Sequence, residues 1–81
     1  MKRTYICEIS SNSSYPRYYE VETRSALKCA RKYGRGEGDE IVTVYGNKAM
    51  TTILSCAMWS VEKRAYFRAI APLIDYFKAV L

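Results

Sequence analysis

Five basic residues recur at helical spacing in the first half of the chain. They are Arg24, Lys28, Arg31, Lys32 and Arg35, here called the basic stripe. At about 100° per residue, four of them fall within a band of roughly 60° on a helix, with Lys32 beside them. No carboxylate occurs between Thr23 and Gly36. Because like charges four residues apart repel, an uninterrupted stripe is less common than mixed charge. The pattern indicates either a polyanion-binding helix face or a solvated one.

A second basic motif is KRAYFRAI, residues 63–70, in which polarity alternates. Arg64, Tyr66 and Arg68 share one face of the predicted strand, and small apolar residues share the other. We expect the Arg/Tyr face to lie opposite the main helix, together with three glutamates of the first two strands. These are Glu8, Glu20 and Glu22. Tyrosine between arginines is typical of surfaces that bind single-stranded nucleic acid. Glu–Arg pairs around tyrosine are also typical of an ordinary solvated sheet face, and the glutamates favour that interpretation.

Composition excludes several catalytic chemistries. The chain has no histidine, which is the commonest general base and a frequent metal ligand. Cys7, Cys29 and Cys56 lie far apart within apolar patterns, whereas zinc and redox sites use close pairs, so we predict reduced core thiols. No pair of tyrosine, lysine or carboxylate residues has a spacing that specifies a reaction. We therefore expect no enzyme, no cofactor and no metal site.

The glycines of GRGEGD, residues 34–39, have the spacing GxGxG. A phosphate-binding loop follows a strand and opens a helix, whereas these glycines follow the predicted main helix. They therefore predict a helix stop, in which glycine adopts the left-handed conformation.

The pattern predicts a single α+β domain over residues 1–81. Alternating polarity predicts strands, and a 3.6-residue period predicts helices. The expected strands are residues 3–9, 18–22, 40–46, 52–59 and 64–70. The expected helices are a main helix, capped by Thr23 or Ser25 and ending near Tyr33, and a short closing helix from Pro72. The order β-β-α-β-β-β-α predicts an antiparallel sheet of about five strands with the main helix packed on one face.

The last ten residues, PLIDYFKAVL, are apolar around much of a helix. Covering the sheet face opposite the main helix would bury them, and contact with a second copy or a protein partner is the alternative. No apolar run reaches the roughly 18 residues that span a bilayer, and the amino end has no signal-peptide pattern. We therefore expect a cytoplasmic protein without a membrane partner.

From Thr23 onward the expected order α-β-β-β-α is similar to that of double-stranded RNA-binding domains. Those domains carry a lysine-rich start to their second helix, which contacts phosphates. In APLIDYFKAVL, residues 71–81, the only cation is Lys78, toward the far end. Element order alone assigns the sequence to no family.

The sequence favours a small non-catalytic binding protein. Thirteen Lys and Arg against eight Asp and Glu give a net charge of +5, which attracts acidic partners without identifying them. Eight tyrosines, mixed charge and the apolar tail favour a protein partner, contacted through tyrosine-rich and basic surfaces, and no small-molecule ligand is inferred. The alternative is a nucleic-acid-binding module, which the net charge and the basic stripe favour. The candidate partner-binding or polyanion-binding residues are Arg24, Lys28, Arg31, Lys32, Arg35, Arg64, Tyr66 and Arg68.

Overall fold

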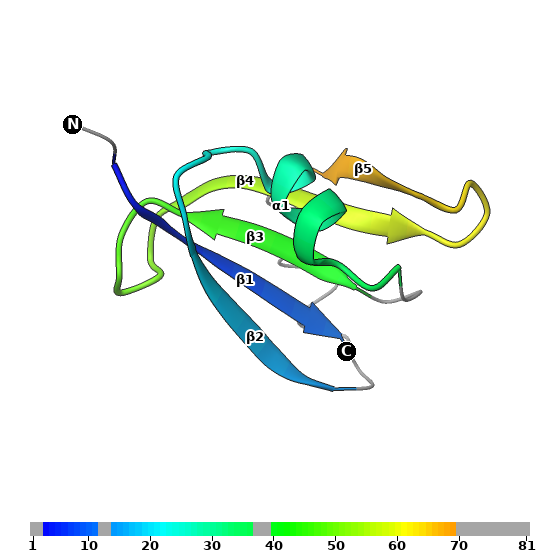
Figure 1. Cartoon of the computed structure of the whole chain (residues 1–81), viewed down its shortest axis with the longest axis horizontal. Helices are drawn as coiled ribbons and strands as arrows, with labels where there is room; N and C mark the ends of the chain where they lie inside the picture. Colours follow the sequence, from blue (N-terminus) through cyan, green and yellow to red (C-terminus); the bar gives the residue numbers. More distant parts are fainter. Residues whose placement is uncertain (1–2, 12–13, 37–39, 70–81) are drawn as a thin grey trace.

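The computed structural model describes residues 3–11, 14–36 and 40–69. Its elements are β1 (Tyr5–Ser11), β2 (Ser14–Val21), α1 (Ala26–Tyr33), β3 (Ile41–Tyr45), β4 (Ile53–Ser60) and β5 (Ala65–Ala69). The strands form one antiparallel sheet in the order β2-β1-β3-β4-β5, and α1 packs on one face of it (Figure 1). This arrangement confirms the predicted α+β fold. The closing helix predicted from Pro72 lies outside the described residues.

The start of α1 is held by hydroxyl groups. Ser25 caps the helix, because its Oγ accepts a hydrogen bond from the backbone N–H of Lys28 at 3.3 Å. Ser55 of β4 gives a second anchor, since its Oγ accepts from the N–H of Ala26 at 2.8 Å and donates to the carbonyl oxygen of Arg24. The predicted cap at Ser25 is confirmed, and the anchor fixes the first turn of α1 against the sheet.

The last residue of α1 is Tyr33, and Gly34 caps the helix where the glycines predicted its end. The predicted left-handed conformation of this glycine is wrong. Gly34 has φ −70° and ψ 153°, which is extended backbone open to any residue, and its N–H donates to the carbonyl of Ala30 at 2.8 Å. Glycine is needed there for space, because a Cβ atom would lie 1.9 Å from the hydroxyl oxygen of Tyr66. The left-handed conformation occurs two residues later, at Gly36 with φ 70°.

The main core lies between α1 and the sheet. Its buried side chains are Cys7, Ile9, Val21, Ala26, Cys29, Ala30, Val42, Val44 and Ala57. In β1 these buried residues alternate with half-buried ones, as the polarity of the sequence predicted. Cys7, Cys29 and Cys56 are all buried and free, as the sequence predicted. A hydrogen bond with Cys29 and burial raise the pKa of the Cys7 thiol well above its usual value, so this thiol remains protonated and unreactive.

The central strand β3 is buried on both faces. Val42 and Val44 face α1, whereas Ile41, Thr43 and Tyr45 point to the far face and are only 2 %, 0 % and 6 % exposed. The far side of β3 is therefore interior as well. The predicted covering of this face by the C-terminal segment lies outside the described residues and stays a prediction.

The strand β2 begins at Ser14, whereas the sequence predicted a loop as far as Arg17. Pro16 lies within this strand, although proline has no N–H for the hydrogen-bond ladder. The strand order places β2 at the edge of the sheet, where one side of the strand has no ladder to complete. The proline is therefore tolerated within β2.

The strand β5 presents the opposite face from the one predicted. Tyr66 packs against the core on the α1 side and meets Trp59 in a T-shaped contact with ring centroids 4.9 Å apart. Phe67, the next residue, faces away and is 42 % exposed. Arg64 is not in the strand but in the preceding turn, with φ 51°. The expectation that Tyr66 and its arginines lie opposite the helix is wrong.

Candidate functional site

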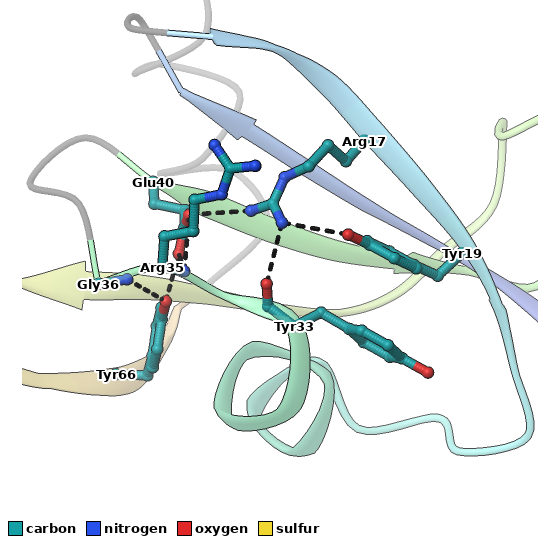
Figure 2. A network of polar contacts seen from close by, with 7 residues as sticks. All are labelled: Arg17, Tyr19, Tyr33, Arg35, Gly36, Glu40 and Tyr66. Atoms are coloured by element: carbon teal, nitrogen blue, oxygen red, sulfur yellow. Dashed lines mark hydrogen bonds and ion pairs between the residues drawn. The ribbon is translucent and has the colours of Figure 1, made fainter.

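A buried carboxylate, Glu40, lies at the centre of a polar network between α1 and the sheet. Glu40 is 2 % exposed. Its oxygens accept hydrogen bonds from the backbone N–H of Arg35 at 3.1 and 3.2 Å, and from the hydroxyl of Tyr66. The guanidinium of Arg17 is 3.3 Å away and forms the ion pair (Figure 2). The charge of Glu40 is therefore both paired and solvated by donors from the protein.

The same network ties β2, α1 and β5 to the residue immediately before β3. Arg17 of β2 also donates to the hydroxyl of Tyr19 and to the carbonyl of Tyr33, the last residue of α1, both at 3.1 Å (Figure 2). The hydroxyl oxygen of Tyr66 in β5 accepts from the N–H of Gly36 at 2.9 Å. Burial, and then the hydrogen bond to Glu40, raise the pKa of Tyr66 to about 12. The hydroxyl therefore remains a donor at neutral pH.

The network has the properties of a structural staple rather than a reactive site. Glu40 is almost fully buried, and its oxygens are bonded to Arg17, Arg35 and Tyr66. The glycine-rich loop is used in the same way, because the N–H groups of Arg35 and Gly36 bond Glu40 and Tyr66. These two N–H groups are therefore not available to hold a phosphate.

The basic stripe forms the solvent face of α1 and its two flanks. All five of its side chains are exposed. Lys32 lies over the ring of Tyr33, with its Nζ 5.2 Å from the ring centroid. Tyr33 in turn stacks on Tyr19 of β2, with ring centroids 4.1 Å apart and an angle of 14° between the planes (Figure 2). The stripe thus ends beside a stacked pair of tyrosines.

Carboxylates among the described residues lie mostly away from this stripe. Glu8 of β1 and Glu20 of β2 lie on the face of the sheet opposite α1. On that face Glu8 accepts a hydrogen bond from the hydroxyl of Tyr45. Glu40 is buried and paired with Arg17, and Glu62 lies in the turn before β5. Glu22 follows the end of β2 and is the described acid nearest the stripe in sequence. Among the described residues, the exposed charges on and beside α1 are therefore mostly cations.

An open groove extends the positive region at the start of α1. It has a volume of about 450 Å³, and its lining includes Arg24 and Arg68 as well as the apolar side chains of Leu27 and Leu54. Arg68 reaches it because β5 turns its Arg/Tyr face toward α1. The structure thus brings Arg68 together with one end of the basic stripe, although the sequence placed it on the other face.

Of the eight candidate residues, six lie on the α1 side as exposed cations: the five of the stripe and Arg68. Tyr66 is half-buried and belongs to the staple, and Arg64 lies apart in the hairpin turn. The sequence missed Arg17, Tyr19 and Tyr33 as neighbours of the stripe. The signal was present, because Arg17 and Tyr19 share the parity of the inward residue Val21.

The tyrosines are mostly used for packing. Tyr45 is buried, and four others pack against the main core. Those four are Tyr5, Tyr19, Tyr33 and Tyr66. Tyr15 and Tyr18 of β2 are exposed at 91 % and 52 %, and Tyr76 is outside the described residues. The high tyrosine content is therefore weaker support for a protein-binding surface than the sequence suggested.

A scan against protein-family models and searches of curated proteins and of solved structures found no match to this chain. Within the described ranges, no group of three or more cysteine or acidic side chains is placed to hold a metal ion. The described part of the chain also contains no helix that is both long enough and apolar enough to cross a membrane. Function is therefore argued from the surface of the molecule alone.

Proposed function

We propose that this protein is a non-catalytic nucleic-acid-binding module that holds the phosphate backbone along the basic stripe. The observation that carries the proposal is the segregation of charge. Five exposed cations line α1 and its flanks, while Glu8 and Glu20 lie on the other side of the sheet. Lysine and arginine on one face supply the sequence-independent part of nucleic-acid affinity.

The Arg/Tyr face of β5 lies on the α1 side of the sheet, and not on the opposite side as the sequence indicated. The glutamates were expected to surround the Arg/Tyr strand face, which favoured an ordinary solvated sheet. Because Tyr66 and Arg68 instead face α1, the strand adds a cation to the stripe side, whereas Glu8 and Glu20 lie on the far face of the sheet. A polyanion that approaches α1 meets little repulsion from these acids, which supports nucleic acid over the protein partner that the sequence placed first.

The absence of catalysis is part of the proposal. It is supported by the burial of Glu40, whose hydrogen-bonding capacity is used by Arg17, Arg35 and Tyr66. It is supported also by the burial of all three cysteine thiols, which keeps them from an external electrophile.

The test is a set of binding isotherms with the native protein at several salt concentrations. The probes are a single-stranded DNA oligonucleotide, its duplex and a poly-glutamate peptide of matched charge, from roughly 50 to 200 mM salt. We expect the oligonucleotide to bind more tightly than the peptide, with affinity falling linearly in a log–log plot. No measurable binding of either nucleic acid at the lowest salt would refute the proposal.

A protein partner is the second candidate function, and the groove beside Arg24 and Arg68 is the observation that favours it. A groove lined by Leu27 and Leu54 together with two arginines suits a peptide segment that carries a carboxylate next to an apolar side chain. Tighter binding of the poly-glutamate peptide than of the oligonucleotide would support this candidate.

A further inference from the structure

A small hollow lies against the basic stripe, between the end of β2 and α1. It has a volume of about 130 Å³ and is lined by Val21, Thr23, Lys28, Cys29, Lys32 and Tyr33. A cavity of roughly 150 Å³ holds one benzene ring in a protein core. The hollow is therefore of the size of a single planar ring and too small for a folded peptide segment.

The hollow has an apolar interior. Val21 and Cys29 are 8 % and 2 % exposed, so their side chains form its floor. The ring of Tyr33 forms part of the wall and is fixed by its stacking on Tyr19. A flat apolar or aromatic ligand would find these surfaces already in place, which reduces the entropy cost of ordering them on binding.

The rim of the hollow is cationic and carries one hydroxyl group. Lys28 and Lys32 are four residues apart on α1, so their ammonium groups lie on the same side of the helix. The Oγ of Thr23 accepts from the N–H of Ser25 at 3.1 Å, which leaves the hydroxyl hydrogen able to donate elsewhere. The site thus combines a ring-sized apolar slot, a hydroxyl donor and two cations.

We propose that this hollow receives the base of one unpaired pyrimidine nucleotide, with the adjacent phosphates held by Lys28 and Lys32. A pyrimidine matches the slot because it is a single ring with carbonyl oxygens that accept from a hydroxyl. Aromatic side chains interleaved with cations are the usual means of holding single strands. This inference rests on the proposed function and adds that the module prefers single-stranded, pyrimidine-rich nucleic acid over duplex.

The test compares probes that differ only in their bases. Oligomers of about ten nucleotides, within the usual site sizes of single-strand-binding folds, are titrated into the native protein at one salt concentration. The probes are oligo-dT, oligo-dA, a strand of the same length without bases, and a duplex. Base stacking predicts that oligo-dT binds at least about fivefold more tightly than the strand without bases, and more tightly than oligo-dA or duplex.

Variants of Tyr33 localise the effect. Tyr33→Leu removes the aromatic ring and should lower the ratio of the affinity for oligo-dT to the affinity for the strand without bases. Tyr33→Phe keeps the ring and should retain the advantage. Thermal unfolding of both variants verifies that each is folded, and the comparison of probes on the native chain stands even if Tyr33→Leu does not fold.

The outcomes separate the two proposals. Equal affinity of the native protein for all single strands, with or without bases, would overturn the nucleotide subsite and leave the stripe proposal intact. Preference for oligo-dA would overturn the assignment of a single-ring base. Failure of every nucleic-acid probe, with binding of poly-glutamate, would overturn both and indicate an acidic protein partner.

Discussion

The guanidinium of Arg17, in edge strand β2, lies 3.3 Å from the carboxylate of Glu40, immediately before central strand β3. The pair is separated by 23 residues and joined through Tyr66 to the other edge of the sheet. Breaking a buried ion pair leaves an uncompensated charge, which costs far more than the pair itself contributes. The staple formed by this network therefore holds the end of α1 against the sheet and fixes the direction of the basic stripe.

Removing the hydroxyl of Tyr66 should weaken this staple. In Tyr66→Phe the buried carboxylate of Glu40 loses one donor, and the N–H of Gly36 loses its acceptor. We expect the free energy of unfolding to fall by about 1–3 kcal/mol, measured by denaturant titration. Tyr15→Phe is the matched control, because Tyr15 is 91 % exposed, and it should change stability by less than about 0.5 kcal/mol. An equal loss of stability in the two variants would mean that the Tyr66 hydroxyl does not stabilise the staple.

The raised pKa of Tyr66 predicts a stability change at alkaline pH. The pKa rises from 10.0 to about 12 on folding, so protonation of Tyr66 is favoured in the native state. The stability that the protonated Tyr66 hydroxyl contributes is fully present below the pKa of the unfolded chain. It is lost as the pH rises through the pKa of the folded protein. The difference in unfolding free energy between the native protein and Tyr66→Phe should therefore shrink between pH 10 and pH 12. Urea titrations at stepped pH measure it, and a constant difference would count against the assignment.

Gly34→Ala should be poorly tolerated for steric reasons. A Cβ atom there would lie 1.9 Å from the Tyr66 hydroxyl oxygen and 2.5 Å from the carbonyl oxygen of Ala30, and neither atom can move without breaking a hydrogen bond. We expect a loss of about 1–3 kcal/mol in denaturant titration. Gly46→Ala is the control, since its Cβ would meet only the end of the Leu54 side chain at 3.2 Å. If Gly46→Ala proves the more damaging change, the steric account of Gly34 is wrong.

Thr43 offers a stabilising substitution. Its hydroxyl is fully buried on the far face of β3 and has no hydrogen-bond partner among the described residues. Thr43→Val keeps the β-branched shape and removes a polar atom whose burial is unfavourable. The free energy of unfolding should rise by about 1 kcal/mol, as seen in chemical denaturation. A loss of stability of that size would mean that the hydroxyl has a partner.

The sequence predicted the elements well because their signals are local. Alternation identified the strands, and Ser25 marked the start of the helix by its ability to accept from Lys28. The face of β5 was not predictable in this way. Alternation shows which residues share a face, but it does not show which face meets the helix, and both sides of this edge strand are partly exposed. Tyr66 faces the α1 side, where its hydroxyl donates to the buried carboxylate of Glu40. No sequence pattern indicated that this acceptor lies there.

The candidate site divides along the same line. Spacing alone predicted the basic stripe, of which Lys28, Arg31 and Lys32 lie on α1, and the other two cations lie just beyond its ends. Its neighbours were not predicted, because the stacking of Tyr19 on Tyr33 and the approach of Arg68 to Arg24 depend on how strands and helix are placed in space. The register of β2 beside β1 also decides that Glu20 lies away from the stripe.

The salt dependence of nucleic-acid binding distinguishes phosphate contacts along the basic stripe from other modes of binding. Arg31→Gln/Arg35→Gln removes two stripe cations that lie outside both the hollow and the groove. Lys48→Gln/Lys63→Gln removes two exposed cations from the turns at the ends of the sheet and serves as the charge-matched control. Affinity for oligo-dT is measured against salt for the native protein and both variants. The account predicts that the slope of log affinity against log salt falls by about 1.4 for the stripe variant, from about 0.7 for each phosphate contact, and is unchanged in the control. Equal slopes in all three proteins would contradict it.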